Sequence, residues 1–194
     1  MNKSSMIQLA VALGAGFVVG GAIFAVWPGG SGAEVNADTS DSTNQSAGDH
    51  AADDGRKVAD FTLPDLEGEP VKFSEFAAGR PFVITFGQTT CPPCVGQSLV
   101  FKKLESKYED KVAFLKIYIG QEPAVAAAQV KQLKSKTKTL TDLRAEIYYR
   151  YGDRSVPVTL VGDSEGRIIV VKESMIPEAE LVRLLDPLLA EKDA

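Results

Sequence analysis

The chain has 194 residues, of which 44% are apolar, so it can form one domain with a substantial core. Its formal net charge of −5 gives no electrostatic reason to expect nucleic acid as a partner. The one histidine, His50, lies in a stretch of small and polar residues that we expect to be unstructured. Catalysis or metal binding that needs an imidazole within the folded domain is therefore excluded.

The N-terminal segment predicts a membrane anchor. Residues 7–27 carry no charge and are long enough to span a hydrocarbon core of about 30 Å. Lys3 precedes this run and the first charge after it is Glu34, so we expect the N-terminus in the cytoplasm and the rest of the chain outside. A cleaved signal peptide is the alternative, and it would export the domain equally well.

Residues 28–57 predict a flexible, acidic linker, because they contain almost no large apolar side chains and are rich in Ser, Asp, Asn, Thr and Gly. The folded domain is then expected at 58–194.

The elements expected in this domain alternate between strands and helices. A β-hairpin around residues 61–73 is followed by a buried strand at 80–86, which leads directly into the two cysteines, and by a helix after them. Further elements are a strand at 112–119, helices at 123–135 and 141–151, two antiparallel strands at 158–161 and 167–172, and a helix at 177–190. This order predicts an α/β fold with a central mixed sheet flanked by helices.

Cys91 and Cys94 are the only cysteines, in the motif Cys-Pro-Pro-Cys. A tetrahedral zinc site would need two more Cys or His ligands, which the domain does not supply. A structural disulfide would close a loop of two residues and so would stabilise the fold very little. We therefore expect a redox-active pair, placed at the carboxyl end of a central strand where open α/β sheets carry their chemistry.

The start of a helix favours a thiolate at Cys91, through free N–H groups and the positive end of the helix dipole. Cys94, one turn later, is then placed to attack a mixed disulfide formed at Cys91 and to release the partner. Pro92 and Pro93 supply no N–H groups, so we expect a weakly stabilised thiolate. The predicted reduction potential is nearer to about −270 mV, as in thioredoxin, than to about −120 mV, as in DsbA.

Three segments together resemble a known family. These are "FTLPDLEGEPVKFSEFAAGRPFVITFGQTTCPPC", "LTDLRAEIYYRYGDRSVPVTLVGDSEGRI" and the N-terminal anchor. They resemble the membrane-tethered, thioredoxin-like thiol-disulfide oxidoreductases of the TlpA/ResA type, over about residue 58 to the C-terminus. Beside the cysteine motif, the matching positions are Phe61 and Leu63, Val156 and Pro157, and Asp163 with Gly166.

The resemblance implies a thioredoxin fold with an N-terminal hairpin and a cis peptide bond at Val156–Pro157, where a trans proline at a strand start is otherwise the commoner case. It implies a catalytic domain outside a bacterial inner membrane, in the periplasm, with no cofactor. The implied substrates are disulfide-containing exported proteins, such as apocytochrome c or copper-site proteins, and a transmembrane thiol carrier would be the electron donor.

The chain departs from the family pattern at four positions near the cysteines. Thr90 replaces the usual tryptophan, Gln97 a glutamate and Leu99 a proline, while Thr85 stands where thioredoxins have a buried aspartate. These residues leave the proton acceptor for Cys94 unidentified.

Two other functions stay open at this point. The first is a peroxiredoxin-like peroxidase, for which Thr89 and Thr90 are suitably close to Cys91. The second is a Cu(I)-binding metallochaperone that would use both thiolates.

Overall fold

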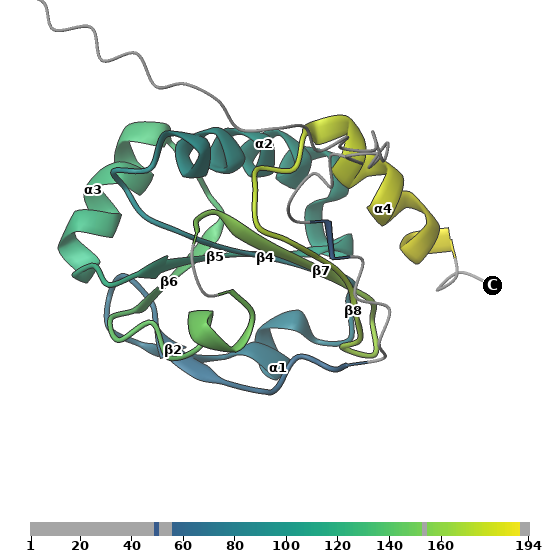
Figure 1. Ribbon diagram of the computed structural model, residues 1–194, viewed down its shortest axis with the longest axis horizontal. Helices are drawn as coiled ribbons and strands as arrows, with labels where there is room; N and C mark the ends of the chain where they lie inside the picture. Colours follow the sequence, from purple (N-terminus) through teal and green to yellow (C-terminus); the bar gives the residue numbers. More distant parts are fainter. Residues whose placement is uncertain (1–48, 51–55, 153–154, 191–194) are drawn as a thin grey trace, which may run out of the picture. The chain divides into compact units, whose positions relative to one another are not determined.

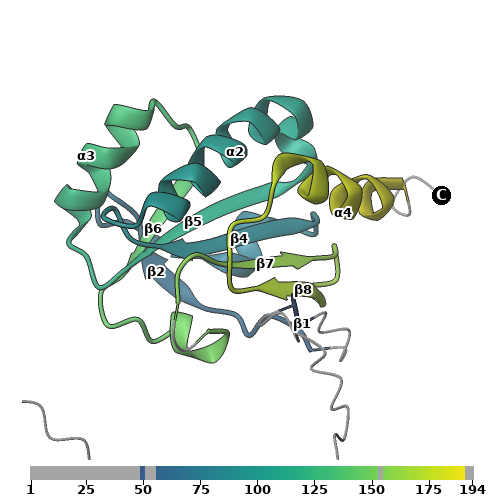
Figure 2. The ribbon, with the colours of Figure 1, turned by 45° about the horizontal axis from the view of Figure 1, so that its top comes forward.

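The computed structural model describes residues 49–50, 56–152 and 155–190, which belong to a unit spanning residues 44–194. Its centre is a six-stranded sheet with the order β1-β8-β7-β4-β5-β6 (Figure 2). The central strands β4, β5 and β6 are parallel, whereas β7, β8 and β1 continue the sheet antiparallel. The bounds are β1 Asp49–His50, β4 Phe82–Gly87, β5 Ala113–Ile119, β6 Lys138–Asp142, β7 Val158–Gly162 and β8 Ile168–Lys172. The expected mixed sheet is confirmed.

Helices and a hairpin cover the two faces of this sheet (Figure 1). One face carries α2 (Pro92–Tyr108) and α4 (Glu178–Ala190), with α3 (Pro123–Leu133) beside α2 towards β6. The opposite face carries the antiparallel hairpin of β2 (Thr62–Pro64) and β3 (Pro70–Lys72), followed by the short helix α1 (Phe73–Ala77). The hairpin prediction is confirmed, while α1 was not expected from the sequence.

Side-chain alternation along β4 separates two hydrophobic cores. Phe82, Ile84 and Phe86 pack towards the hairpin and α1, together with Phe61 and Phe73. Val83 packs towards the other face, where it joins a core formed with residues of α2 and α4, namely Phe101, Leu104, Tyr108, Leu181 and Leu185. Because side chains of a strand alternate between faces, Thr85 and Gly87 lie on the α2 face with Val83. This places two small residues of β4 beneath the start of α2.

The prediction of a helix at 141–151 is wrong. Its first residues belong to β6, the parallel edge strand beside β5, and only a short 3₁₀ turn at Tyr148–Arg150 follows. The buried Asp142 carboxylate explains the break, because it accepts hydrogen bonds from the backbone N–H groups of Glu146, Ile147 and Tyr148 at 2.8–3.2 Å. These bonds stabilise a turn instead of a helix.

Part of the predicted linker is also described. Asp49 and His50 form β1 and pair with Lys172 and Val171 at the edge of the sheet, so the expectation that His50 is unstructured is wrong. Lys57 likewise forms a bridge with Arg167. Among the residues that the structure describes, no helix is both long enough and apolar enough to cross a membrane. The anchor predicted at 7–27 lies outside them.

Candidate active site

The two cysteines lie where β4 leads into α2, as the sequence predicts. Cys91 is the N-cap residue of α2, and its Sγ accepts a hydrogen bond from the Cys94 N–H at 3.2 Å. Pro92 and Pro93 occupy the first helical positions, where a missing N–H group costs no intrahelical bond. The Cys94 N–H is thus the backbone donor that contacts the Cys91 sulfur, and it would also stabilise a thiolate there.

Cys91 and Cys94 are joined by a disulfide bond, with the two Cα atoms 5.2 Å apart. The two side chains differ in their exposure. Cys91 is partly exposed, whereas Cys94 is 2% exposed and lies against Gly87 of β4. A Cβ atom at Gly87 would lie 3.1 Å from Cys94 Cβ and 3.2 Å from its Sγ, so a glycine is what allows this close approach. Only Cys91 of the pair is accessible to another protein's disulfide.

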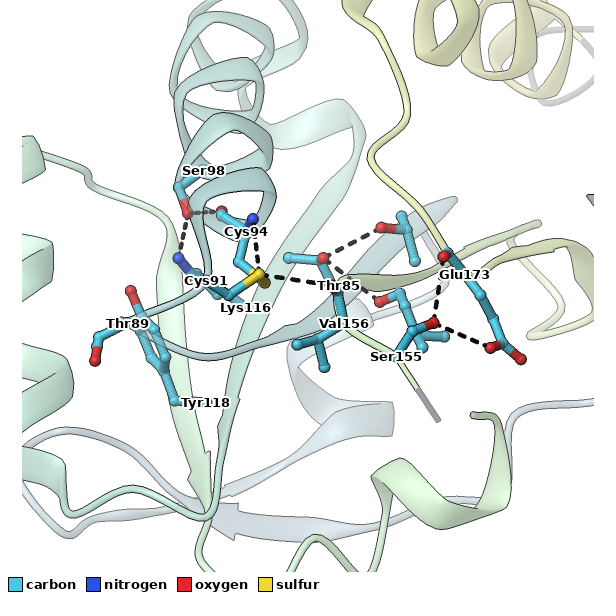
Figure 3. The surroundings of a disulfide bond; sticks show 12 residues. Thr85, Thr89, Cys91, Cys94, Ser98, Lys116, Tyr118, Ser155, Val156 and Glu173 are labelled. Atoms are coloured by element: carbon cyan, nitrogen blue, oxygen red, sulfur yellow. Dashed lines mark hydrogen bonds between the residues drawn. A yellow bond between two sulfur atoms is a disulfide. The ribbon is translucent and has the colours of Figure 1, made fainter. Parts of the chain in front are cut away.

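The loop before β7 brings a second segment to the cysteines. The Val156–Pro157 peptide bond is cis, as the resemblance implies, and Pro157 is buried. The carbonyl oxygen of Val156 lies 3.5 Å from Cys91 Sγ (Figure 3). Next to it, the exposed Ser155 donates a hydrogen bond to the Glu173 carboxylate at 3.2 Å. Residues 65 positions apart in the chain therefore form one site.

The other two residues singled out from the sequence lie elsewhere around this site. Thr90 is exposed, and its neighbour Thr89 is held by Gln121 through hydrogen bonds of 2.7 and 2.8 Å. Gln97 is fully buried, and its Oε1 accepts a hydrogen bond from the Ile176 N–H at 2.7 Å. Its side-chain amide therefore attaches α2 to the segment before α4. Gln97 Nε2 has no hydrogen-bond partner among the described residues.

A buried polar cluster, which sequence reasoning missed, lies beneath the first turns of α2. Its members are Thr85 of β4, Ser98 of α2, Lys116 of β5 and Thr159 of β7, all 3% exposed or less. The Thr85 and Thr159 hydroxyls are 3.2 Å apart and share a hydrogen bond. Lys116 Nζ donates to Ser98 Oγ, and burial lowers the pKa of the Lys116 ammonium to about 8. The signal available in the sequence was a lysine inside the otherwise apolar strand "VAFLKIYI".

The described residues contain no group of three or more His, Cys, Asp or Glu side chains that could hold a metal ion. The chemistry that this arrangement can perform is thiol-disulfide exchange at Cys91, with a second thiol directly behind it.

The Redoxin family model matches residues 53–185, which cover the sheet from β4 to β8 and both cysteines. The chain belongs to the Redoxin family. Two similar proteins are named thiol-disulfide oxidoreductase ResA. The one from Bacillus thuringiensis subsp. konkukian is 28% identical over 116 residues, 59% of this chain and 66% of that protein. The one from Halalkalibacterium halodurans is 26% identical over 137 residues, 69% and 77% of the respective chains. The resemblance to TlpA/ResA-type proteins is confirmed.

Solved structures with low sequence identity share the fold. A DsbF homologue from Corynebacterium diphtheriae superposes with a TM-score of 0.65 at 19% identity and covers 72% of this chain and 92% of its own. A secreted Mycobacterium tuberculosis disulfide oxidoreductase homologous to E. coli DsbE has a TM-score of 0.59 at 21% identity and covers 66% and 96%. The fold is thioredoxin-like, as expected.

Proposed function

We propose that this chain is a thiol-disulfide oxidoreductase that exchanges disulfides with other proteins through Cys91 and Cys94. The observation that carries the proposal is the unequal exposure of two bonded cysteines at the start of one helix. A structural disulfide has no need of an accessible sulfur, and the loop it would close here is too short to stabilise the fold appreciably. The similarity of the chain to the proteins named ResA supports the same activity.

The two cysteines then have different roles. In the reduced protein the Cys91 thiolate attacks one sulfur of a substrate disulfide, so that a mixed disulfide forms and the other substrate sulfur leaves as a thiolate. Cys94 next loses its proton and attacks Cys91 Sγ. The bond between Cys91 and the substrate breaks, the Cys91–Cys94 disulfide forms, and the substrate is released with two thiols. Two electrons have passed from this chain to the substrate.

The surroundings of Cys91 are suited to a polypeptide substrate. Val156 is partly exposed beside the sulfur, so its backbone is available to an extended chain. Leu99 and Met175 are 45% and 38% exposed, and Met175 Sδ lies close enough to Gly96 of α2 to contact a Cβ placed there at 2.8 Å. Exposed apolar side chains on and beside the helix that begins at Cys91 favour substrates that are incompletely folded.

The finer assignments follow from the sequence and the family. The chain is inferred to be a single-pass protein of a bacterial inner membrane, anchored by residues 7–27 with the domain in the periplasm. It would reduce disulfides of exported proteins during cytochrome c maturation or copper-site assembly, and a transmembrane thiol carrier would return it to the dithiol form.

Trapping of mixed disulfides tests the proposal. The full-length Cys94→Ser variant lacks the thiol that releases the substrate, so it should retain partner proteins covalently at Cys91 when it is produced in the exported compartment of a bacterial host. The Cys91→Ser variant is the matched control and should retain none. Equal capture by both variants, or capture by neither, would contradict the assigned roles, and the identity of the captured proteins tests the pathway.

A further inference from the structure

Lys116 is a charged side chain buried within the central sheet next to the active site. It is 3% exposed, and on the same face of β5 it lies two residues after Phe114, which belongs to the core between the sheet and α2. Burying an ammonium group is costly unless it is paired, and a methionine would fill such a position without that cost. A lysine here is therefore explained better by chemistry than by packing.

The contacts of Lys116 connect it with Cys94. Its Nζ donates a hydrogen bond to Ser98 Oγ, and Ser98 Oγ in turn donates to the carbonyl oxygen of Cys94 at 2.9 Å. Figure 3 shows the side chain extending from β5 to Ser98, under the turn of α2 that carries Cys94. Nζ also lies 4.3 Å from the centre of the Tyr118 ring, which limits its position from the other side.

Among the described residues, no carboxylate forms an ion pair with Lys116. Strand β4 contributes Thr85, its partner in the parallel register, and β6 contributes Thr139. The titratable groups beside it are the Tyr118 phenol, whose pKa is raised by burial, and Cys94, which is reached through Ser98. The Glu105 carboxyl of α2 bonds to Thr137 instead. Burial alone lowers the pKa of Lys116 to about 8, so about a tenth of this amine is neutral at pH 7, far more than for an exposed lysine.

We propose that the neutral amine of Lys116 accepts the proton of the Cys94 thiol when Cys94 attacks the mixed disulfide, and that Ser98 positions Lys116 for this step. The proposal rests on the proposed function. The Cys94 S–H bond breaks and the proton passes to Nζ. The sulfur that results attacks Cys91 Sγ, and the substrate sulfur leaves with the electron pair of the broken bond. When the disulfide is reduced again, the Lys116 ammonium returns the proton to Cys94.

Lys116 in this way fills a role for which the two positions that carry a carboxylate in related proteins supply none in this chain. At the position where thioredoxins have an aspartate, Thr85 bonds to Thr159, and at the position where the family has a glutamate, Gln97 bonds to the Ile176 backbone. Neither threonine nor glutamine can accept a proton at neutral pH.

The kinetics of 5,5′-dithiobis(2-nitrobenzoate) reduction by the reduced full-length protein separate the two thiol steps. The first release of thionitrobenzoate reports the attack by one cysteine, and the second reports the attack by Cys94 on the mixed disulfide. For the wild type we expect the second rate to rise with pH and to level off above about pH 8. In Lys116→Met the second rate at pH 7 should fall about 100-fold, while the first stays within about twofold.

Two further variants separate a proton acceptor from a structural contact. Lys116→Gln retains a donor for Ser98 Oγ but no base, so its second step should be as slow as that of Lys116→Met. Lys102→Met is the matched control, because Lys102 is an exposed lysine of α2 whose Nζ donates to the Leu133 carbonyl oxygen. Both rates of this variant should equal those of the wild type.

A wild-type second rate in Lys116→Gln, or an unchanged pH profile in both Lys116 variants, would overturn the proposal for Lys116. Failure of the wild type to form any mixed disulfide would instead overturn the proposed function, so the two failures are distinguishable.

Discussion

Replacing Lys116 with methionine should stabilise the folded protein in a manner that depends on pH. Burial lowers the pKa of this lysine from 10.5 to about 8, and one pH unit corresponds to about 1.4 kcal/mol. At pH 7 Lys116 is mostly protonated in both states. Keeping this charge in the buried site therefore lowers the free energy of unfolding by about 3 kcal/mol. Lys116→Met removes this cost.

The sign follows from proton binding. The folded pKa lies below the unfolded one, so between about pH 8 and pH 10.5 the unfolded chain binds more protons than the folded protein. The stability contributed by Lys116 accordingly increases as the pH rises through this window. The advantage of Lys116→Met over the wild type should be about 3 kcal/mol larger at pH 7 than at pH 10.5.

Urea unfolding of the oxidised proteins measures this difference, because the disulfide keeps both thiols from titrating. Other lysines and tyrosines titrate equally in both proteins, so their effects cancel in the comparison. Lys102→Met should show the same stability difference from the wild type at both pH values. A difference between Lys116→Met and the wild type that does not change with pH would refute the inference that burial lowers the pKa of Lys116.

Two further substitutions test the start of α2 and the turn after β6. Pro93→Ala adds an N–H group near Cys91 Sγ, so it should stabilise the thiolate and raise the reduction potential by about 30 mV in a glutathione or dithiothreitol titration. The wild-type potential itself should lie near about −270 mV, and a value above about −180 mV would show that the missing N–H groups do not weaken the thiolate. Asp142→Ala leaves three backbone N–H groups without their acceptor. It should lower the free energy of unfolding, measured in urea, by about 3 kcal/mol. A loss below about 1 kcal/mol would mean that the turn does not depend on this carboxylate.

The sequence predicted the parts of the site that depend on local pattern. An apolar run before Cys91 and a proline after it indicate a strand that leads into a helix, and the structure has β4 and α2 there. The cis bond at Val156–Pro157 came from the resemblance instead, since local sequence favours the trans form.

The helix expected at 141–151 shows where local pattern was insufficient. Thr139 and Thr141 alternate with Leu140 in a period typical of a strand, but this segment is short and is followed by residues with good helix propensity. Pairing with β5 makes this segment a strand, and the three hydrogen bonds to Asp142 form the turn after it. The pairing depends on residues distant in sequence, and the turn depends on a polar side chain that lies outside the hydrophobic periodicity.

Lys116 was missed for a related reason. Its position in an apolar strand was visible, but its relation to Cys94 depends on two facts that the sequence does not provide. The first is the parallel register that puts Lys116 beside Thr85, and the second is the position of Ser98, which bonds to both Lys116 and the Cys94 carbonyl oxygen. Tertiary contacts across the sheet, which local reasoning cannot supply, therefore determine which residues act with the cysteines.

The central claim is that Cys91 attacks the substrate disulfide and Cys94 releases the substrate. Its most direct test is mass spectrometry of the products after the reduced wild type and each reduced cysteine variant have reacted with one equivalent of a disulfide-bonded protein. The wild type should end as the free Cys91–Cys94 disulfide, with the substrate heavier by two hydrogen atoms. Cys94→Ser should end as a covalent adduct, and peptide mapping should place the bond at Cys91. An adduct through Cys94 in the Cys91→Ser variant, or reduction of the substrate by that variant, would contradict the assignment of Cys91 as the nucleophile and Cys94 as the thiol that releases the partner.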